Sequence, residues 1–192
     1  MQELKDRIVK EGKVLPGNII KVDGFLNHRI DTELMDHIAK EFGKHFNMDE
    51  VTMILTAEAS GIALSAIVAH HFHKPMIFAK KAKSDNIEGG LYQSDIFSYT
   101  YKKKVTLLVS KEWISSDDKI LIIDDFMANG EAMRGLCDIV KAAGATLVGI
   151  GCAVEKGFQG GGDRLRAAGV NLKSLAIIES AEPGNIVFRD DD

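Results

Sequence analysis

Residues 120–132 read ILIIDDFMANGEA, an apolar run that passes through two acidic residues into a turn of small residues. The four apolar residues that open it predict a strand buried on both faces of a parallel sheet. From Glu131 to Ala143 apolar residues recur at the spacing of a helix that packs on a core. We therefore expect a strand, a tight turn and a helix, with Asp124 and Asp125 at the carboxyl end of the strand.

The rest of the chain repeats this alternation. Apolar runs of strand length lie at residues 51–56, 75–79, 146–154 and 172–179. Helical periodicity lies at residues 31–46 and 62–71. Strands that alternate with helices predict an α/β fold with a doubly wound parallel sheet, in which ligands bind beyond the carboxyl ends of the strands.

Composition limits the class of protein. At 192 residues the chain can bury one sizeable core, so we expect a single domain spanning residues 1–192. The net charge of -4 gives no general cationic field for nucleic acid. The charged N-terminal segment has no apolar run of signal-peptide length, no later segment is long and apolar enough to span a membrane, and the two cysteines are too few for a disulfide framework. We expect a cytoplasmic protein with neither nucleic acid nor membrane as a partner.

Residues 80–104 differ from the rest of the chain. They are polar, contain Gly89-Gly90, and include an alternating stretch at residues 97–101. Long segments of this kind in compact domains are often functional. Two interpretations stay open at this stage: a long flexible loop that acts as a lid, or a long hairpin.

The turn at residues 128–132 has the chemistry of a phosphate site. Backbone N–H groups in such a turn and at the following helix N-terminus converge on an anion with little side-chain help. Asp124 and Asp125 would then accept hydrogen bonds from the hydroxyls of a ribose attached to that phosphate. A solvated strand end is the plainer alternative. A Walker loop is absent, and Gly149-Ile150-Gly151 has Val154 where a dinucleotide fingerprint needs a third glycine.

This order of strand, acidic pair and small-residue loop resembles the signature of type I phosphoribosyltransferases for phosphoribosyl pyrophosphate (PRPP). The loop comprises Ala128, Asn129, Gly130, Glu131 and Ala132. The family's loop is richer in Thr and Gly, so Asn129, Glu131 and Ala132 depart from it and remove hydroxyls, while the backbone donors remain. The variant is similar to the loop of bacterial xanthine phosphoribosyltransferases.

The resemblance implies further features. It implies a small hood formed by the N-terminal and C-terminal parts of the chain, to which about residues 1–36 contribute, Mg²⁺ bound together with PRPP, and a homodimer. It also implies that the turn holding Glu58 and Ser60 contacts the pyrophosphate of PRPP. Lys81 lies near the start of the long polar segment, where a cation could meet that pyrophosphate. From the residues alone, that turn is an ordinary strand-to-helix connection, and a lone lysine is usually just solvated.

Three residues match the purine site of the xanthine enzymes. Ile20 would cover the ring face, and the Asn27 amide, which both donates and accepts, would address groups near the 2-position. Lys156 can only donate, which favours a 6-oxo over a 6-amino group. Phe158 could stack on the base, although a local apolar anchor is the commoner role.

The resemblance implies transfer of phosphoribosyl from PRPP to xanthine. Guanine or hypoxanthine remains the alternative base. A noncatalytic PRPP-sensing regulator is the alternative of another class, disfavoured because we expect neither a DNA-binding module nor a basic surface in this chain. We expect no protein metal site, and read His70, His71 and His73 as an exposed group near a helix end.

Overall fold

The computed structural model describes residues 1–81, 90–98 and 103–190. Its helices are α1 (Gln2–Glu11), α2 (Thr32–His45), α3 (Gly61–His71), α4 (Glu131–Ala142) and α5 (Gly161–Ala167), with short helical turns η1 (Asp23–Asn27), η2 (Lys111–Trp113) and η3 (Gly157–Gln159). Its strands are β1 (Lys13–Leu15), β2 (Ile19–Lys21), β3 (Met53–Ala57), β4 (Met76–Ala79), β5 (Leu91–Ser98), β6 (Lys103–Ser110), β7 (Lys119–Met127), β8 (Thr146–Lys156), β9 (Leu172–Glu182) and β10 (Asn185–Phe188).

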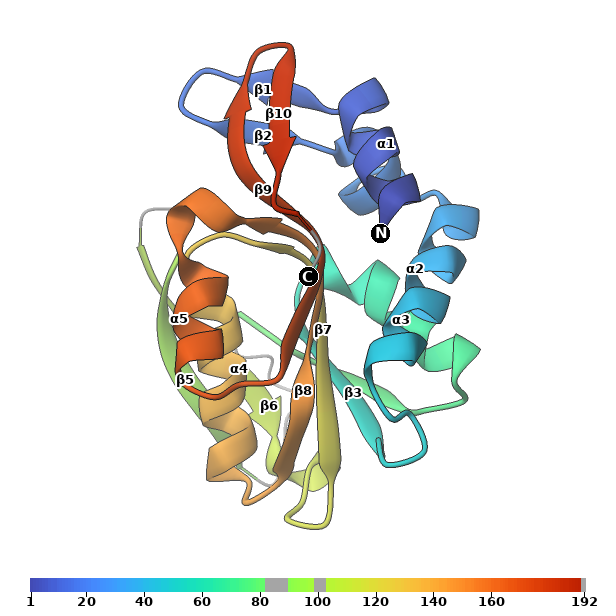
Figure 1. The fold of residues 1–192 in the computed structure, drawn as a ribbon. Coiled ribbons are helices and arrows are strands. Elements are labelled where there is room, and N and C mark those ends of the chain that lie inside the picture. The colour runs from blue at the N-terminus through green and yellow to red at the C-terminus, as the bar shows by residue number, and fades with distance from the viewer. Residues whose placement is uncertain (82–89, 99–102, 191–192) are drawn as a thin grey trace.

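The central sheet has the order β10-β9-β8-β7-β3-β4. Its strands pair in parallel except β10, which runs antiparallel to β9. Helices α2 and α3 cover one face and α4 and α5 cover the other (Figure 1). The prediction of a doubly wound α/β sheet is confirmed, and every helix and strand that the periodicity predicted is present.

Strand β7 separates two apolar cores. Leu121 and Ile123 pack into the core that contains α2 and α3, whereas Ile120 and Ile122 pack into the core beneath α4. All four side chains are fully buried. Because successive side chains point to opposite faces of a strand, an unbroken apolar run is what a sheet covered on both faces requires. The end of β7 is therefore held from both sides.

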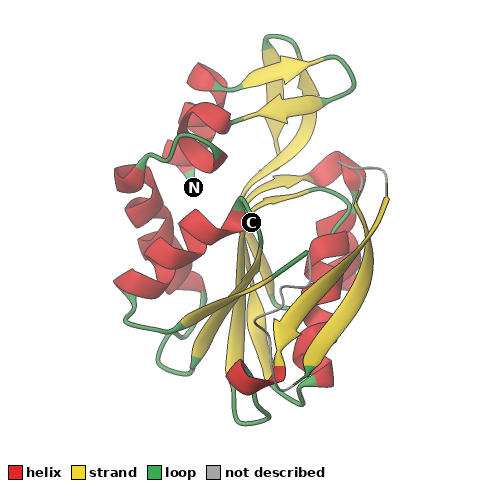
Figure 2. Cartoon of the chain, turned by 180° about the vertical axis from the view of Figure 1, so that it is seen from behind, coloured by secondary structure: helices red, strands yellow, loops and turns green. Residues whose placement is uncertain are grey.

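Both ends of the chain form the predicted hood. Helix α1 and the β1–β2 hairpin lie at one end of the molecule beside β10 and the end of β9 (Figures 1 and 2). The N-terminal ammonium donates to the carbonyl oxygen of Leu175 at 2.6 Å, and Arg7 pairs with Asp31 at 3.0 Å. Asp31 also caps α2 by accepting from the Leu34 N–H at 3.2 Å.

The segment at residues 80–104 contains the start of a hairpin. Strands β5 and β6 pair antiparallel, and Lys80 forms a bridge with Leu108. Gly135 of α4 lets the hairpin approach closely, because an added Cβ would lie 2.5 Å from Cγ2 of Ile96. The hairpin interpretation is thus confirmed for the described strands, while residues 82–89 and 99–102 of the predicted loop lie outside the described residues.

We predict that Gly149→Ala and Gly151→Ala each lower the free energy of unfolding by about 1–3 kcal/mol, because overpacking strains a filled core. A Cβ at Gly149 would lie 2.6 Å from the Phe46 ring and 2.8 Å from the Asn171 carbonyl oxygen. One at Gly151 would lie 2.7 Å from Ile123 and 2.9 Å from Phe42. Urea unfolding tests this. Gly24→Ala is the control, because a Cβ there meets nothing within 4 Å; an equal loss in all three variants would contradict the packing argument.

Candidate active site

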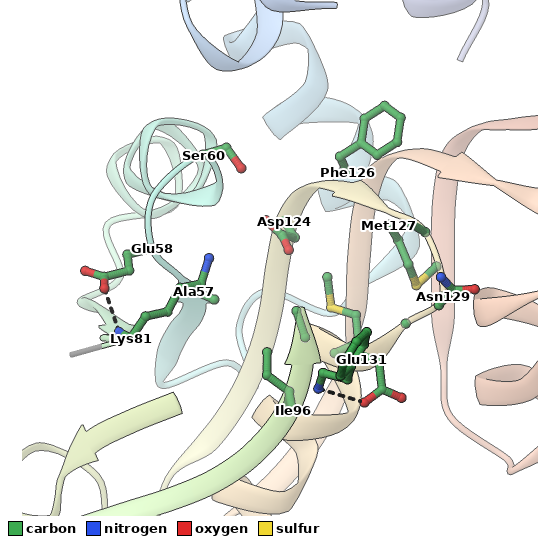
Figure 3. A pocket seen from close by; sticks show the side chains of 15 residues that line it. Ala57, Glu58, Ser60, Lys81, Ile96, Asp124, Phe126, Met127, Asn129 and Glu131 are labelled. Atoms are coloured by element: carbon green, nitrogen blue, oxygen red, sulfur yellow. Dashed lines mark hydrogen bonds between the residues drawn. The ribbon is translucent and has the colours of Figure 1, made fainter. Parts of the chain in front are cut away.

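A cavity of about 270 Å³ lies where β3 and β7 end. Its wall contains most of the residues expected to bind PRPP: Glu58, Ser60, Lys81, Asp124, Ala128, Asn129, Gly130, Glu131 and Ala132 (Figure 3). Apolar residues complete the wall: Ala57, Ile96, Phe97, Phe126, Met127 and Met133. The fold therefore brings Asp124 from the strand end, the phosphate loop and the turn after β3 together around one space.

The phosphate loop, residues 128–132, runs from the end of β7 into α4. Gly130 is the N-cap of α4 and has φ +77, a left-handed conformation that favours glycine. The carboxylate of Glu131 accepts from the N–H of Phe97 at 3.4 Å and from Arg134 at 3.2 Å. The acidic side chain in this loop is thus paired with donors, while the first amides of α4 keep no intrahelical acceptor.

Asp124 lies in the cavity wall and is 7% exposed. Its Oδ1 accepts from the N–H of Asp125 at 3.0 Å. Burial, followed by the charge of Asp125, raises the pKa of Asp124 well above its ordinary value, and the nearby positive charge of Lys81 acts in the opposite direction. The Asp124 carboxyl therefore has little contact with water and is open to a hydrogen-bonding partner from the cavity.

Asp125 is 1% exposed and does not line the cavity. Its Oδ1 accepts from Ser60 Oγ at 2.8 Å, and its Oδ2 accepts from Asn27 Nδ2 at 3.0 Å. The same carboxylate therefore joins the turn before α3 and the hood to the end of β7. The sequence analysis predicted that both acids lie at the carboxyl end of a strand. It did not predict that Ser60 and Asn27 bond to Asp125.

The turn after β3 is closely packed. The N–H of Glu58 donates to the Ala79 carbonyl oxygen at 3.0 Å, and the Glu58 side chain accepts from the N–H of Lys81 at 2.5 Å. The Glu58–Ala59 peptide bond is cis. The turn and Lys81, which were predicted to act together, thus contact each other directly.

The residues expected to bind purine lie between hood and core, outside the cavity wall. Ile20 is 8% exposed and packs into the core that contains α2 and α3. Lys156 Nζ donates to the Asn18 carbonyl oxygen at 3.0 Å and lies 5.5 Å from the centre of the Phe126 ring. Burial lowers the pKa of Lys156. Asn27 and Lys156 each connect hood to core in this structure.

The apolar half of the wall was missed by the sequence analysis. Ile96 and Phe97 reach the cavity from the β5–β6 hairpin, and Phe126 points from the strand end toward the hood (Figure 3). Phe126 follows the acidic pair directly, so its place at the strand end was available as a signal. The two hairpin residues come from a separate sheet, and no local pattern indicated where they would lie.

His71, Cys137 and Phe158 lie outside the cavity wall. His71 pairs with Asp36 at 2.8 Å, and among the described residues no group of three or more His, Cys, Asp or Glu could hold a metal ion. Burial raises the pKa of the Cys137 thiol to about 11, so the thiol is protonated at neutral pH. Phe158 packs against the core.

No helix in the described part of the chain is long and apolar enough to cross a membrane.

Comparison with known proteins decides the family. The model of the phosphoribosyl transferase domain matches residues 25–168. The chain belongs to the phosphoribosyltransferase family. Proteins named xanthine phosphoribosyltransferase from Lachnoclostridium phytofermentans and Bifidobacterium adolescentis are 52% and 50% identical to it, over 100% and 98% of this chain and 100% of each relative.

Solved structures show the same fold. Adenine phosphoribosyltransferase from Giardia lamblia, in complex with 9-deazaadenine, matches with a TM-score of 0.76 at 20% identity, covering 93% of this chain and 98% of that one. At that identity the match carries the fold alone. The type I phosphoribosyltransferase resemblance and the fold class predicted from the sequence are confirmed.

We predict that Asp124→Asn raises the free energy of unfolding at neutral pH. Because the folded-state pKa of Asp124 is raised, the charged carboxylate disfavours folding. The stability that the protonated group provides is complete below its unfolded-state pKa, near 3.8, and is lost as pH rises through the folded-state value.

Chemical unfolding at a series of pH values measures the effect. The wild type and the variant should converge as pH falls to the unfolded-state pKa, and should separate above it with the variant the more stable. A variant that is less stable than the wild type at neutral pH would contradict a desolvated Asp124.

Proposed function

We propose that this chain transfers the 5-phosphoribosyl group of PRPP to xanthine and releases xanthosine 5′-monophosphate and pyrophosphate. The observation that carries the proposal is full-length similarity, at about half of all positions, to several proteins named xanthine phosphoribosyltransferase. The cavity at the ends of β3 and β7 supports it, because it collects the groups that a phosphorylated sugar and its leaving group need.

The 5′-phosphate would bind to the backbone N–H groups of the phosphate loop. These amides lie at the N-terminus of α4, a helix of 12 residues, where N–H groups and the helix dipole favour an anion. Asp124 would accept hydrogen bonds from the ribose hydroxyls, and Asp125 would do so by exchanging its bond to Asn27 or to Ser60.

The pyrophosphate would lie against Glu58, Ser60 and Lys81 on the other side of the cavity. Mg²⁺ fits this chemistry, because it prefers oxygen ligands and keeps much of its water; Asp124 and Glu58 supply carboxylates in the wall, and the ion would neutralise charge on the departing pyrophosphate. Catalysis would then consist of holding both substrates in line and stabilising charge as the bond at C1 breaks.

The purine would enter between hood and core, near Phe126. Lys156 and Asn27 would exchange their present partners, the Asn18 carbonyl and Asp125, for the oxo groups and ring edge of the base. Ile20 would contribute apolar surface from the hood. An ammonium that only donates supports a 6-oxopurine over adenine.

The proposal includes the setting of the enzyme. We propose one domain over residues 1–192 and a cytoplasmic location, which the two free cysteines support because reducing compartments keep thiols unpaired. We also propose a homodimer, as the family resemblance implies. Trp113, which is 61% exposed, is a large apolar side chain that such an association could cover.

We predict that xanthosine 5′-monophosphate forms from PRPP, Mg²⁺ and xanthine with a kcat/KM at least about tenfold above that for guanine or hypoxanthine, a difference that one purine contact can supply. Adenine should give no product. Chromatography of parallel reactions, one per base, resolves each nucleotide.

Each other outcome has its own meaning. A preference for guanine or hypoxanthine would correct the base while leaving the family chemistry intact. Absence of turnover with every base, together with PRPP-dependent binding of DNA in a filter assay, would replace the enzyme by a PRPP-sensing regulator.

A further inference from the structure

Arg164 lies on α5, next to the phosphate loop. Its Nη2 donates to the carbonyl oxygen of Asn129 at 3.0 Å, and its Nη1 donates to the carbonyl oxygen of Gln159 at 3.4 Å. The first of these acceptors belongs to the loop itself. An exposed arginine on a neighbouring element is therefore bonded to the backbone whose N–H groups would bind phosphate.

The orientation of one peptide unit follows from this contact. A trans peptide is planar, so its C=O and N–H point in opposite directions; among the described residues the cis bond is at Glu58–Ala59, not here. With the Asn129 oxygen directed at Arg164, the N–H of Gly130 is directed away from Arg164. Asn129 and Gly130 both line the cavity.

Because Gly130 is flexible, the orientation of the Asn129–Gly130 peptide depends on a contact from outside the loop. Glycine reaches left-handed and right-handed backbone conformations with similar ease, so φ +77 at Gly130 is not enforced by its own side chain. Without a partner for the Asn129 oxygen, this peptide could rotate and present a carbonyl where an anion needs a donor.

Helix α5 is itself firmly placed. Gly161 packs on the loop so closely that an added Cβ would lie 2.6 Å from the Asn129 carbonyl carbon and 2.6 Å from the Gly130 nitrogen. Glu155 is fully buried and accepts from both Nη atoms of Arg166, at 3.1 and 2.6 Å. Ser174 Oγ donates to the same carboxylate at 2.5 Å. A buried, fully paired carboxylate thus fixes the helix from which Arg164 extends.

We infer that Arg164 is a positioning residue for the 5′-phosphate: by binding the Asn129 carbonyl it holds the Gly130 N–H toward the phosphate. The inference rests on the proposed function and deepens it. It concerns the 5′-phosphate end of PRPP and leaves the pyrophosphate end, around Glu58 and Lys81, unaffected.

The test compares Arg164→Met with Arg164→Lys and the wild type. For Arg164→Met, the KM for PRPP and the Kd for ribose 5-phosphate should rise about tenfold, the effect of losing one hydrogen bond to a charged group. The Kd for pyrophosphate should stay unchanged, and kcat should change by less than about twofold, because ground state and transition state use the phosphate equally. Arg164→Lys, which keeps one donor, should recover part of the affinity.

Lys141→Gln is the matched control. It removes the same charge from the far end of α4 and should leave every constant at its wild-type value, whereas a rise in KM for this variant would attribute the effect to net charge. The inference is overturned if Arg164→Met, with an unchanged Tm, binds ribose 5-phosphate as the wild type does, or if it loses pyrophosphate binding equally. If the wild type binds neither PRPP nor ribose 5-phosphate, the proposed function fails, and this inference fails with it.

Discussion

The arrangement of the site depends on the hydrogen bonds that the buried carboxylate of Asp125 accepts. It accepts from Ser60 at the start of α3 and from Asn27 in the hood, while its own backbone continues β7 into the phosphate loop. A carboxyl group that is 1% exposed is costly to bury unless its oxygens are hydrogen-bonded, and these two donors offset that cost. Three segments far apart in the sequence are thereby held at one point.

A second constraint is the presence of glycine, which has no side chain, at three points where neighbouring elements pack closely. Gly161 against the phosphate loop, Gly135 beneath Ile96, and Gly61 beside Asp124 each occupy a place in which a Cβ would collide. These contacts place α5 against the phosphate loop, the β5–β6 hairpin against α4, and the start of α3 beside Asp124. The same glycines thus link packing to the geometry of binding.

The sequence was informative where the signal is local. The apolar run of β7, the acidic pair and the small-residue turn lie within 13 consecutive positions, 120–132, and periodicity alone indicated strand, turn and helix. The hood was expected only through family resemblance, because β1 and β2 are three residues each. Helix α5, on a face of the central sheet, is only seven residues long and was not predicted. Elements so short carry almost no periodicity.

Contacts between residues far apart in the sequence could not be predicted from any pattern in the chain. Asn27 was expected to face a purine, and its bond to Asp125 joins residues 98 positions apart. Arg164 and Asn129 are 35 positions apart and give no motif. Such pairs depend on which segments the tertiary fold brings together. They cannot be read from the sequence before the order of the strands in the sheet is known.

The central claim is that the amides at the start of α4 bind the 5′-phosphate. The most direct measurement is a nuclear magnetic resonance titration of the ¹⁵N-labelled protein with ribose 5-phosphate. The account predicts that the amide signals of Gly130, Glu131 and Ala132 move most and saturate together. Saturable binding that leaves these three signals in place while shifting others, such as those of Glu58 and Lys81, would contradict it.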